Sequence, residues 1–242
     1  MNMGSTAVFI LGSHRSGTSC LAGSIQQMGV YLGSVSNKNV YNQKGSRENP
    51  EITRLNESIL KASGGSWQNP PESIVISQEH IDRRNTLLKE LLALGHKTWG
   101  IKDPRTLFTL PFWRKGLSSV QLVGTYRHPL SVARSLHARD GMPLEQGLFI
   151  WWKYNRKLQD YLEEYHFPLI SFDAPEKEYQ ESLERIIKHL GLNCDSKTEM
   201  KQFYSTSLCH HPTENKLVDA HEQIKELYES LAHYEEGYKW NE

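Results

Sequence analysis

The chain has 242 residues, enough for an α/β domain with a sizeable core, and its 28 Lys and Arg residues balance its 28 Asp and Glu residues. This balance argues against a general affinity for nucleic acid or an anionic membrane, so an anion site would have to be local. The three cysteines, Cys20, Cys194 and Cys209, are too few and too widely spaced for a disulfide framework or a zinc site, which favours a reducing compartment.

No apolar stretch is long enough to span a membrane, and the apolar run before Gly12 is too short for the core of a signal peptide. We therefore expect a cytoplasmic protein with no membrane segment and no nucleic-acid polymer as a partner, although a membrane anchor outside this sequence stays open. No internal repeat or low-complexity linker divides the chain, so we expect a single domain over residues 1–242.

Short apolar runs alternate with segments of helical periodicity, which predicts an α/β fold with a mainly parallel sheet flanked by helices. In chain order, the pattern predicts strand Ala7–Gly12, helix Ser19–Met28, a polar loop over Gly29–Gly45, a helix that begins at Asn49-Pro50 and ends at Gly64, a helix from Ser77 to Gly95, strand Thr98–Lys102, strand Val120–Tyr126, a helix after Pro129, a long helix from Pro143 through Tyr161, strand Pro168–Phe172 and a helix that Gly191 ends. Such sheets bind ligands beyond the carboxyl ends of their strands. Three segments that begin at strand ends, 12–19, 102–105 and 127–135, are therefore expected to meet.

The most informative segment is the loop Gly12–Ser19, between the first predicted strand and the first predicted helix. Small residues there leave backbone N–H groups accessible at the positive end of a helix dipole, which is how proteins commonly hold a phosphate. The spacing from Gly12 to Gly17 matches the nucleotide triphosphatase pattern G-x-x-x-x-G-K-[ST], but Thr18 stands in place of the lysine. Arg15 supplies the cation of this loop instead. We therefore predict a P-loop-like phosphate site that is not built for ATP.

A second candidate anion contact combines Arg127, at the end of a predicted strand, with Ser135, about two turns into the following helix. A guanidinium can bind a phosphate through two parallel hydrogen bonds, while a hydroxyl donates from the helix above it. A surface arginine with a solvated serine would give the same pattern.

Together these segments resemble the motifs of sulfotransferases that use 3′-phosphoadenosine 5′-phosphosulfate (PAPS). Ser13–Ser19 is similar to the basic, Ser/Gly/Thr-rich phosphate loop of that family, and Tyr126–Pro129 with Ser135 is similar to its strand-end arginine and helix serine. The sequence KDPR at Lys102–Arg105 is similar to a signature of the bacterial and tyrosyl-protein branches. Glu48–Asn56 is similar to the stretch that carries the catalytic glutamate of those branches. The order and spacing of the motifs agree over most of the chain.

The resemblance implies a role for each of these groups. The 5′-phosphosulfate of PAPS would be held by the loop residues His14, Arg15, Ser16, Gly17, Thr18 and Ser19. Arg127 and Ser135 would hold the 3′-phosphate, which distinguishes PAPS from ATP. Arg15 or Lys102 would stabilise the charge that grows on the leaving phosphate oxygen, and Glu48 would be the base that activates the acceptor hydroxyl. No metal is expected, and the acceptor could be a small-molecule, carbohydrate or peptide hydroxyl.

Alternatives remain for the base and for the function. Asp103, His14 or His128 could be the base, and Glu48 could simply favour the dipole of the helix that follows it. We expect Asp103 to orient Lys102. A small-molecule kinase with a degenerate nucleotide-binding loop would instead use Asp103 to hold a divalent metal. A nucleotide-binding module without catalysis would tolerate the loss of Glu48 and Lys102.

Two positions depart from the family pattern. Cytosolic sulfotransferases carry a tryptophan that stacks on adenine just beyond the loop, where this chain has Cys20. A late loop of the bacterial relatives resembles F-x-x-x-L-R-H, where Phe203–His210 has Cys209 at the arginine position. The adenine contact and a late basic contact to the nucleotide are therefore not carried over. Trp151-Trp152 is expected in the core rather than at the adenine.

Overall fold

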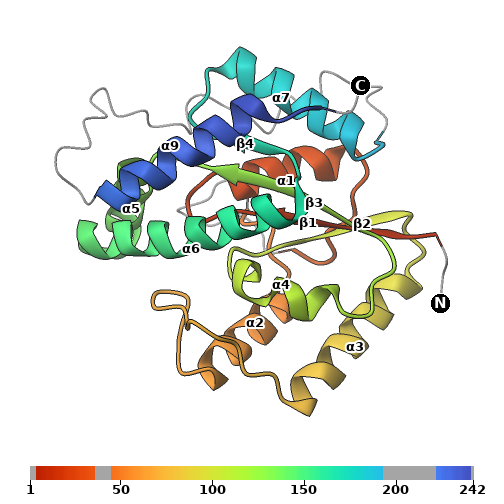
Figure 1. Cartoon of the computed structure of the whole chain (residues 1–242). Helices are drawn as coiled ribbons and strands as arrows, with labels where there is room; N and C mark the ends of the chain where they lie inside the picture. The colour runs from red at the N-terminus through yellow and green to blue at the C-terminus, as the bar shows by residue number, and fades with distance from the viewer. Residues whose placement is uncertain (1–3, 36–44, 193–221, 241–242) are drawn as a thin grey trace.

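The computed structural model describes residues 4–35, 45–192 and 222–240. Its centre is a four-stranded parallel sheet with the strand order β2-β1-β3-β4 (Figure 1), which confirms the predicted fold class. The strands are β1 (Thr6–Leu11), β2 (Thr98–Lys102), β3 (Val120–Tyr126) and β4 (Leu169–Ser171). Because β1 pairs with both β2 and β3, the loop that follows β1 begins in the middle of the carboxyl edge of the sheet.

Helices cover both faces of this sheet. They are α1 (Thr18–Gln27), α2 (Pro50–Ala62), α3 (Gln78–Ala93), α4 (Thr106–Arg114), α5 (Pro129–Asp140), α6 (Leu144–Tyr165), α7 (Glu176–His189) and α9 (Glu222–Gly237). Val8 and Ile10 pack with α1 and α7, whereas Phe9 and Leu11 pack into the larger cluster that α2 to α6 and α9 build. In Figure 1, α6 and α9 run side by side, and α2 and α3 lie together beyond α4. None of the helices in the described ranges is both long and apolar enough to cross a membrane.

The start of α2 follows from its sequence and positions the residue before it. The Oδ1 atom of Asn49 accepts a hydrogen bond from the backbone N–H of Glu51 at 2.9 Å, and Pro50 is the first helical residue. Both features are typical of a helix start, because the cap satisfies a backbone donor and proline has the helical φ angle already. Glu48 therefore lies at a fixed point just before the helix.

Two helices of the described ranges are missing from the sequence-based prediction, whereas the predicted helices and strands are confirmed with bounds that differ by a few residues. Residues 36–44 of the predicted loop Gly29–Gly45 lie outside the described residues. α4 contains Pro111, and a proline inside a helix is locally unfavourable, although the apolar side chains of α4 are buried in the core. The sequence of α9 does indicate a helix, because the apolar residues Ile224, Leu227 and Leu231 recur at helical spacing. All three are buried. Glu235 holds α9 to the sheet by accepting hydrogen bonds from Tyr126 and from the backbone at the end of β4.

Candidate active site

The loop between β1 and α1 needs its two glycines. Gly17 has a φ of 84°, and a Cβ atom there would lie 2.3 Å from the ring of Phe172. At Gly12, with a φ of 153°, a Cβ atom would lie 2.4 Å from the carbonyl oxygen of Thr125. Arg15 also has a positive φ, 62°, which is uncommon for a residue with a side chain. The chain thus adopts a tight, unusual turn, the kind of backbone that collects at functional sites.

This loop offers hydrogen-bond donors that have no partner among the described residues. The hydroxyl groups of Ser13 and Ser16 are buried, and neither forms a hydrogen bond with another described residue. Gly17 caps α1 without a side chain, and the first turn of α1 holds no acidic residue. Unpaired hydroxyls beside an uncapped helix start fit an oxyanion, which would satisfy both.

Lys102, at the end of β2, joins this loop to the start of α2. Its Nζ atom donates to Glu48 Oε1 at 2.7 Å, to the carbonyl oxygen of Ser46 at 2.9 Å and to Ser19 Oγ at 3.2 Å. The ammonium group has three N–H donors, and each has an acceptor here. The Lys102 side chain is only 3% exposed, whereas that of Glu48 is 23% exposed. A buried cation and a carboxylate that solvent can reach are therefore in direct contact.

Arg15, Arg127 and Ser135 come together, but not as the simple pair that the sequence suggests. Arg15 Nε donates to Ser135 Oγ at 2.8 Å. Arg127 Nη1 lies 3.5 Å from the carbonyl oxygen of Arg15, and Arg127 Nε donates to Asp173 Oδ1 at 3.1 Å. The indole N–H of Trp151 donates to the Arg127 carbonyl oxygen and fixes the backbone there. Arg15 is thus the link between the other two.

Two neighbouring loop residues experience an excess of positive charge. Burial lowers the pKa of the Arg15 guanidinium, and the charges of Arg139 and Arg127 lower it further. Burial also holds the pKa of His14 well below its ordinary value of 6.5, with Arg105 as the largest electrostatic contributor. Depressed pKa values in a field of several cations favour a bound anion, because an anion would offset the repulsion.

The ring of His14 lies in an aromatic wall that the sequence did not predict. Its Nε2 atom lies 3.3 Å from the hydroxyl of Tyr154, which donates to the carbonyl oxygen of Trp67 at 2.9 Å. The His14 and Trp67 ring centroids are 4.8 Å apart. The other candidate histidine, His128, packs its ring 5.0 Å from that of Tyr228 on α9 and so is directed to another part of the fold.

Asp103 is directed toward Arg105, whereas the sequence predicts that it orients Lys102. Its Oδ1 atom accepts hydrogen bonds from the backbone N–H of Arg105 at 2.9 Å and from the Arg105 guanidinium at 3.0 Å. A carboxylate that bonds the backbone two residues ahead closes an Asx turn, which directs Asp103 toward Arg105. Arg105 also donates to Glu57 at 2.9 Å. These carboxylates raise the pKa of Arg105 above its ordinary value although burial alone would lower it.

The structure also places most of the other residues that the sequence analysis singled out. Thr18 is buried at the start of α1, and Cys20 is half-buried in the same helix. Trp151 is fully buried, as expected for a core residue, whereas Trp152 is only half-buried and packs against the core. Phe203–His210, including Cys209, lies outside the described residues. In the described part of the chain, no cluster of three or more His, Cys, Asp or Glu side chains is able to hold a metal ion.

We expect the free energy of unfolding to fall as the pH is lowered below about 6.5, in part because of His14. The unfolded imidazole binds a proton near that pH, whereas native His14 stays neutral until the pH is well below it. Well above pH 6.5, His14 is neutral in both the native and the unfolded state, so it no longer changes the free energy of unfolding with pH. His14→Gln should therefore flatten this part of the pH dependence, measured by urea denaturation from about pH 5 to about pH 8.

The matched control is His96→Gln, because His96 is exposed beyond α3. In this variant the free energy of unfolding should change with pH as steeply as in the parent protein. An equally steep pH dependence in His14→Gln and in the parent would contradict the prediction.

Comparison with known proteins identifies similar folds. No family model matches the sequence, and no curated protein matches it. The structure is similar to the sulfotransferase domain of an olefin synthase from Synechococcus, with a TM-score of 0.59, 16% identity, and coverage of 96% of this chain and 97% of that one. It is also similar to a sulfotransferase from Mycobacterium avium, with a TM-score of 0.52, 12% identity, and coverage of 98% and 78%. At these identities the similarity establishes a sulfotransferase-like fold and nothing finer.

Proposed function

We propose that the protein is a sulfotransferase that moves the sulfuryl group of PAPS to a hydroxyl group of an acceptor by in-line transfer. The observation that carries this proposal is the position of Lys102, which contacts both Ser19 in the phosphate loop and Glu48 at the start of α2. Transfer from a phosphate to a hydroxyl needs a cation beside the leaving oxygen and a base beside the attacking one. The Lys102–Glu48 pair supplies both groups at one place.

Unpaired hydroxyls and clustered cations at the loop support a nucleotide with two phosphate positions. The buried hydroxyls of Ser13 and Ser16 lack partners among the described residues, and Arg15 lies in a field of like charge that an anion would relieve. The 5′-phosphosulfate would be held by His14, Arg15, Ser16, Gly17, Thr18 and Ser19. Arg127 and Ser135, which both contact Arg15, would hold the 3′-phosphate.

When bound, PAPS supplies an activated sulfuryl group, and the protein contributes mainly position and charge. Sulfuryl transfer resembles phosphoryl transfer in this respect, because the transition state is loose and its charge lies on oxygen atoms. Lys102 and Arg15 would stabilise the charge on the leaving oxygen. Glu48 would accept the proton of the acceptor hydroxyl, and its partial exposure leaves the acceptor a route to it.

A kinase is the strongest alternative, and two observations weigh against it. Thr18 replaces the lysine that reaches the β- and γ-phosphates in nucleotide triphosphatases. Asp103, the acid that a kinase would need for its metal, accepts two hydrogen bonds from Arg105 through its Oδ1 atom, which leaves only its Oδ2 atom for a metal.

The test is to incubate the protein with sulfur-labelled PAPS and a cell extract and to identify the labelled product. We expect label in a sulfate ester together with release of 3′-phosphoadenosine 5′-phosphate. The matched control is the protein with both Glu48→Gln and Lys102→Met, which should give only background. Transfer of phosphate from γ-labelled ATP in place of sulfate from PAPS would contradict the proposal.

A further inference from the structure

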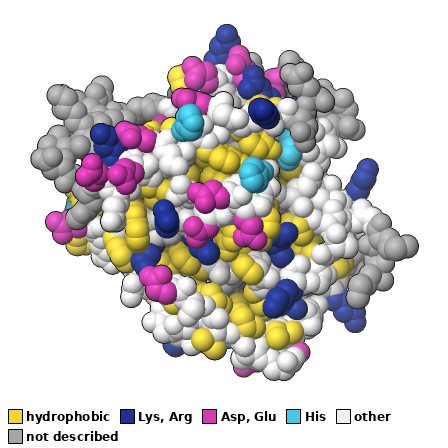
Figure 2. All heavy atoms as spheres, in the orientation of Figure 1, with side chains coloured by type: hydrophobic (Ala, Val, Ile, Leu, Met, Phe, Trp, Pro, Cys, Tyr) yellow, Lys and Arg dark blue, Asp and Glu magenta, His cyan; other side chains and the backbone are white. Residues whose placement is uncertain are grey.

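A second site of ligand size lies on the face shown in Figure 2. A groove of about 610 Å³ lies between α6 on one side and α3, α4 and the segment 71–76 on the other. Hydrophobic side chains line it, chiefly those of Ile74, Ile76, Ile81, Phe108, Phe112 and Trp152. A volume of several hundred Å³ with an apolar lining is typical of sites that bury a small organic ligand.

The rim of this groove is positively charged. Five cationic side chains and two acidic ones line the groove, although the chain as a whole carries no net charge. The cations are Arg84, Lys115, Lys153, Arg156 and Lys157, and the acids are Glu72 and Asp160. The three cations of α6 recur at helical spacing and therefore share one side of that helix. Such a local excess of one charge favours a ligand of the opposite charge.

Arg84 is the most informative of these cations. It is only 8% exposed, its Nη1 atom donates to the carbonyl oxygen of Phe112 at 2.7 Å, and its guanidinium lies 4.9 Å from the Phe112 ring. Its Nε and Nη2 atoms both donate to the side-chain oxygen Oδ1 of Asn85. No carboxylate among the described residues pairs with it, whereas a buried arginine usually has such a partner.

The groove is separate from the candidate active site. Phe108 lines the groove and packs edge-on against Tyr154, with ring centroids 4.9 Å apart. Tyr154 is fully buried, and its hydroxyl contacts His14 in the phosphate loop. The rings of Phe108 and Tyr154 thus lie between the groove and His14, and the groove lining includes none of the candidate active-site residues.

We propose that this groove binds a small amphipathic anion, a molecule with an aliphatic or aromatic body and a carboxylate or sulfate head. The body lies on the hydrophobic floor, and the head pairs with Arg84 and the cations of α6. Glu72, which forms an ion pair with Lys153 across the rim, competes with this head for the same positive charge.

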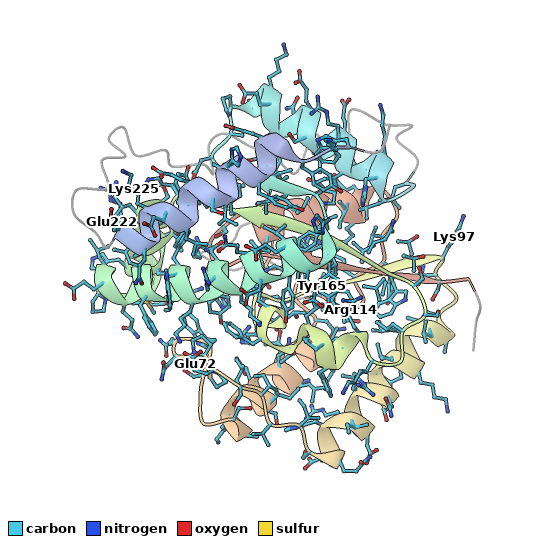
Figure 3. All side chains as sticks on the ribbon, in the orientation of Figure 1. Glu72, Lys97, Arg114, Tyr165, Glu222 and Lys225 are labelled. Carbon is cyan, nitrogen blue, oxygen red and sulfur yellow. The ribbon has the colours of Figure 1, made fainter. Side chains whose placement is uncertain are left out.

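The test is calorimetric titration of the protein with decanoate and with decanol, its uncharged counterpart of the same chain length. Decanoate should bind at least about 10-fold more tightly than decanol, and Arg84→Gln should remove most of that difference. Glu72→Gln should instead tighten decanoate binding a few-fold, because it frees Lys153 for the ligand, and Lys153→Gln should weaken it by a similar factor. Figure 3 labels Glu72 and the control position Lys97, which lies far from the groove.

Two controls define the site. Lys97→Gln removes a surface charge elsewhere, and Arg15→Ala changes the phosphate loop, so both should keep the decanoate affinity of the parent protein. Equal affinity for decanoate and decanol, or loss of binding in Arg15→Ala, would overturn the proposal. Binding of a hexaglutamate peptide without binding of decanoate would also overturn it and assign the groove to an acidic protein segment. If Arg84→Gln does not fold, the opposite effects of Glu72→Gln and Lys153→Gln decide, and their absence overturns the proposal.

Discussion

Glu48→Gln should lower turnover by ~10²–10⁴-fold, the usual contribution of a general base, while nucleotide affinity stays close to that of the parent protein. Glutamine keeps the size of the side chain and an oxygen that accepts from Lys102, so the change removes mainly the ability to take a proton. The measurement is sulfate transfer at saturating PAPS, together with nucleotide binding.

The matched control is Glu51→Gln, which changes another glutamate at the start of α2. Glu51 pairs with Arg54 and Arg83 on the surface and should leave turnover unchanged. Near-normal turnover in Glu48→Gln, combined with its collapse in Asp103→Asn or His14→Ala, would transfer the role of base to one of those residues.

Lys102→Met should lower the rate of transfer by ~10²–10³-fold, as does removal of one group that stabilises a developing oxyanion. The nucleotide dissociation constant should change much less, because the charge that Lys102 faces develops only in the transition state. Single-turnover rates and equilibrium binding measure the two effects separately. Lys97→Met, an exposed lysine just before β2, is the control and should match the parent protein.

The contact between Lys102 and Glu48 adds a sharper expectation. Because the two side chains are only 2.7 Å apart and act on the same transfer, their effects should not add. The variant with both changes should be about as slow as the slower single variant. If Lys102→Met keeps its transfer rate and only weakens nucleotide binding, Lys102 is a binding residue and not a catalytic one.

The sheet and the phosphate loop could be predicted because their signals are local. Each strand is a short apolar run, and the glycines of the loop stand beside the strand whose end they follow. α4 escaped prediction because Pro111 is a local signal against a helix, and burial of the apolar side chains in the core outweighs it. Propensity is a weak prior that tertiary packing often overrides.

The partners of the site residues could not be predicted in the same way. Glu48 and Lys102 are 54 positions apart, and Arg15 and Ser135 are 120 apart, so only the fold brings them together. Asp103 lies near two cations in the sequence, Lys102 and Arg105. The turn that its side chain closes with the backbone of Arg105 directs it toward Arg105. Nothing in the sequence near Tyr154 distinguishes it from an ordinary core residue of α6.

The most direct test is calorimetric binding of 3′-phosphoadenosine 5′-phosphate and of ADP without magnesium. We expect the 3′-phosphorylated nucleotide to bind about 10- to 100-fold more tightly, because one charge-assisted contact contributes about 1.5–3 kcal/mol. Arg127→Ala should remove most of this preference and leave the affinity for ADP nearly unchanged. Equal affinity for the two nucleotides, or a strict requirement for magnesium, would contradict the assignment as a PAPS-dependent sulfotransferase.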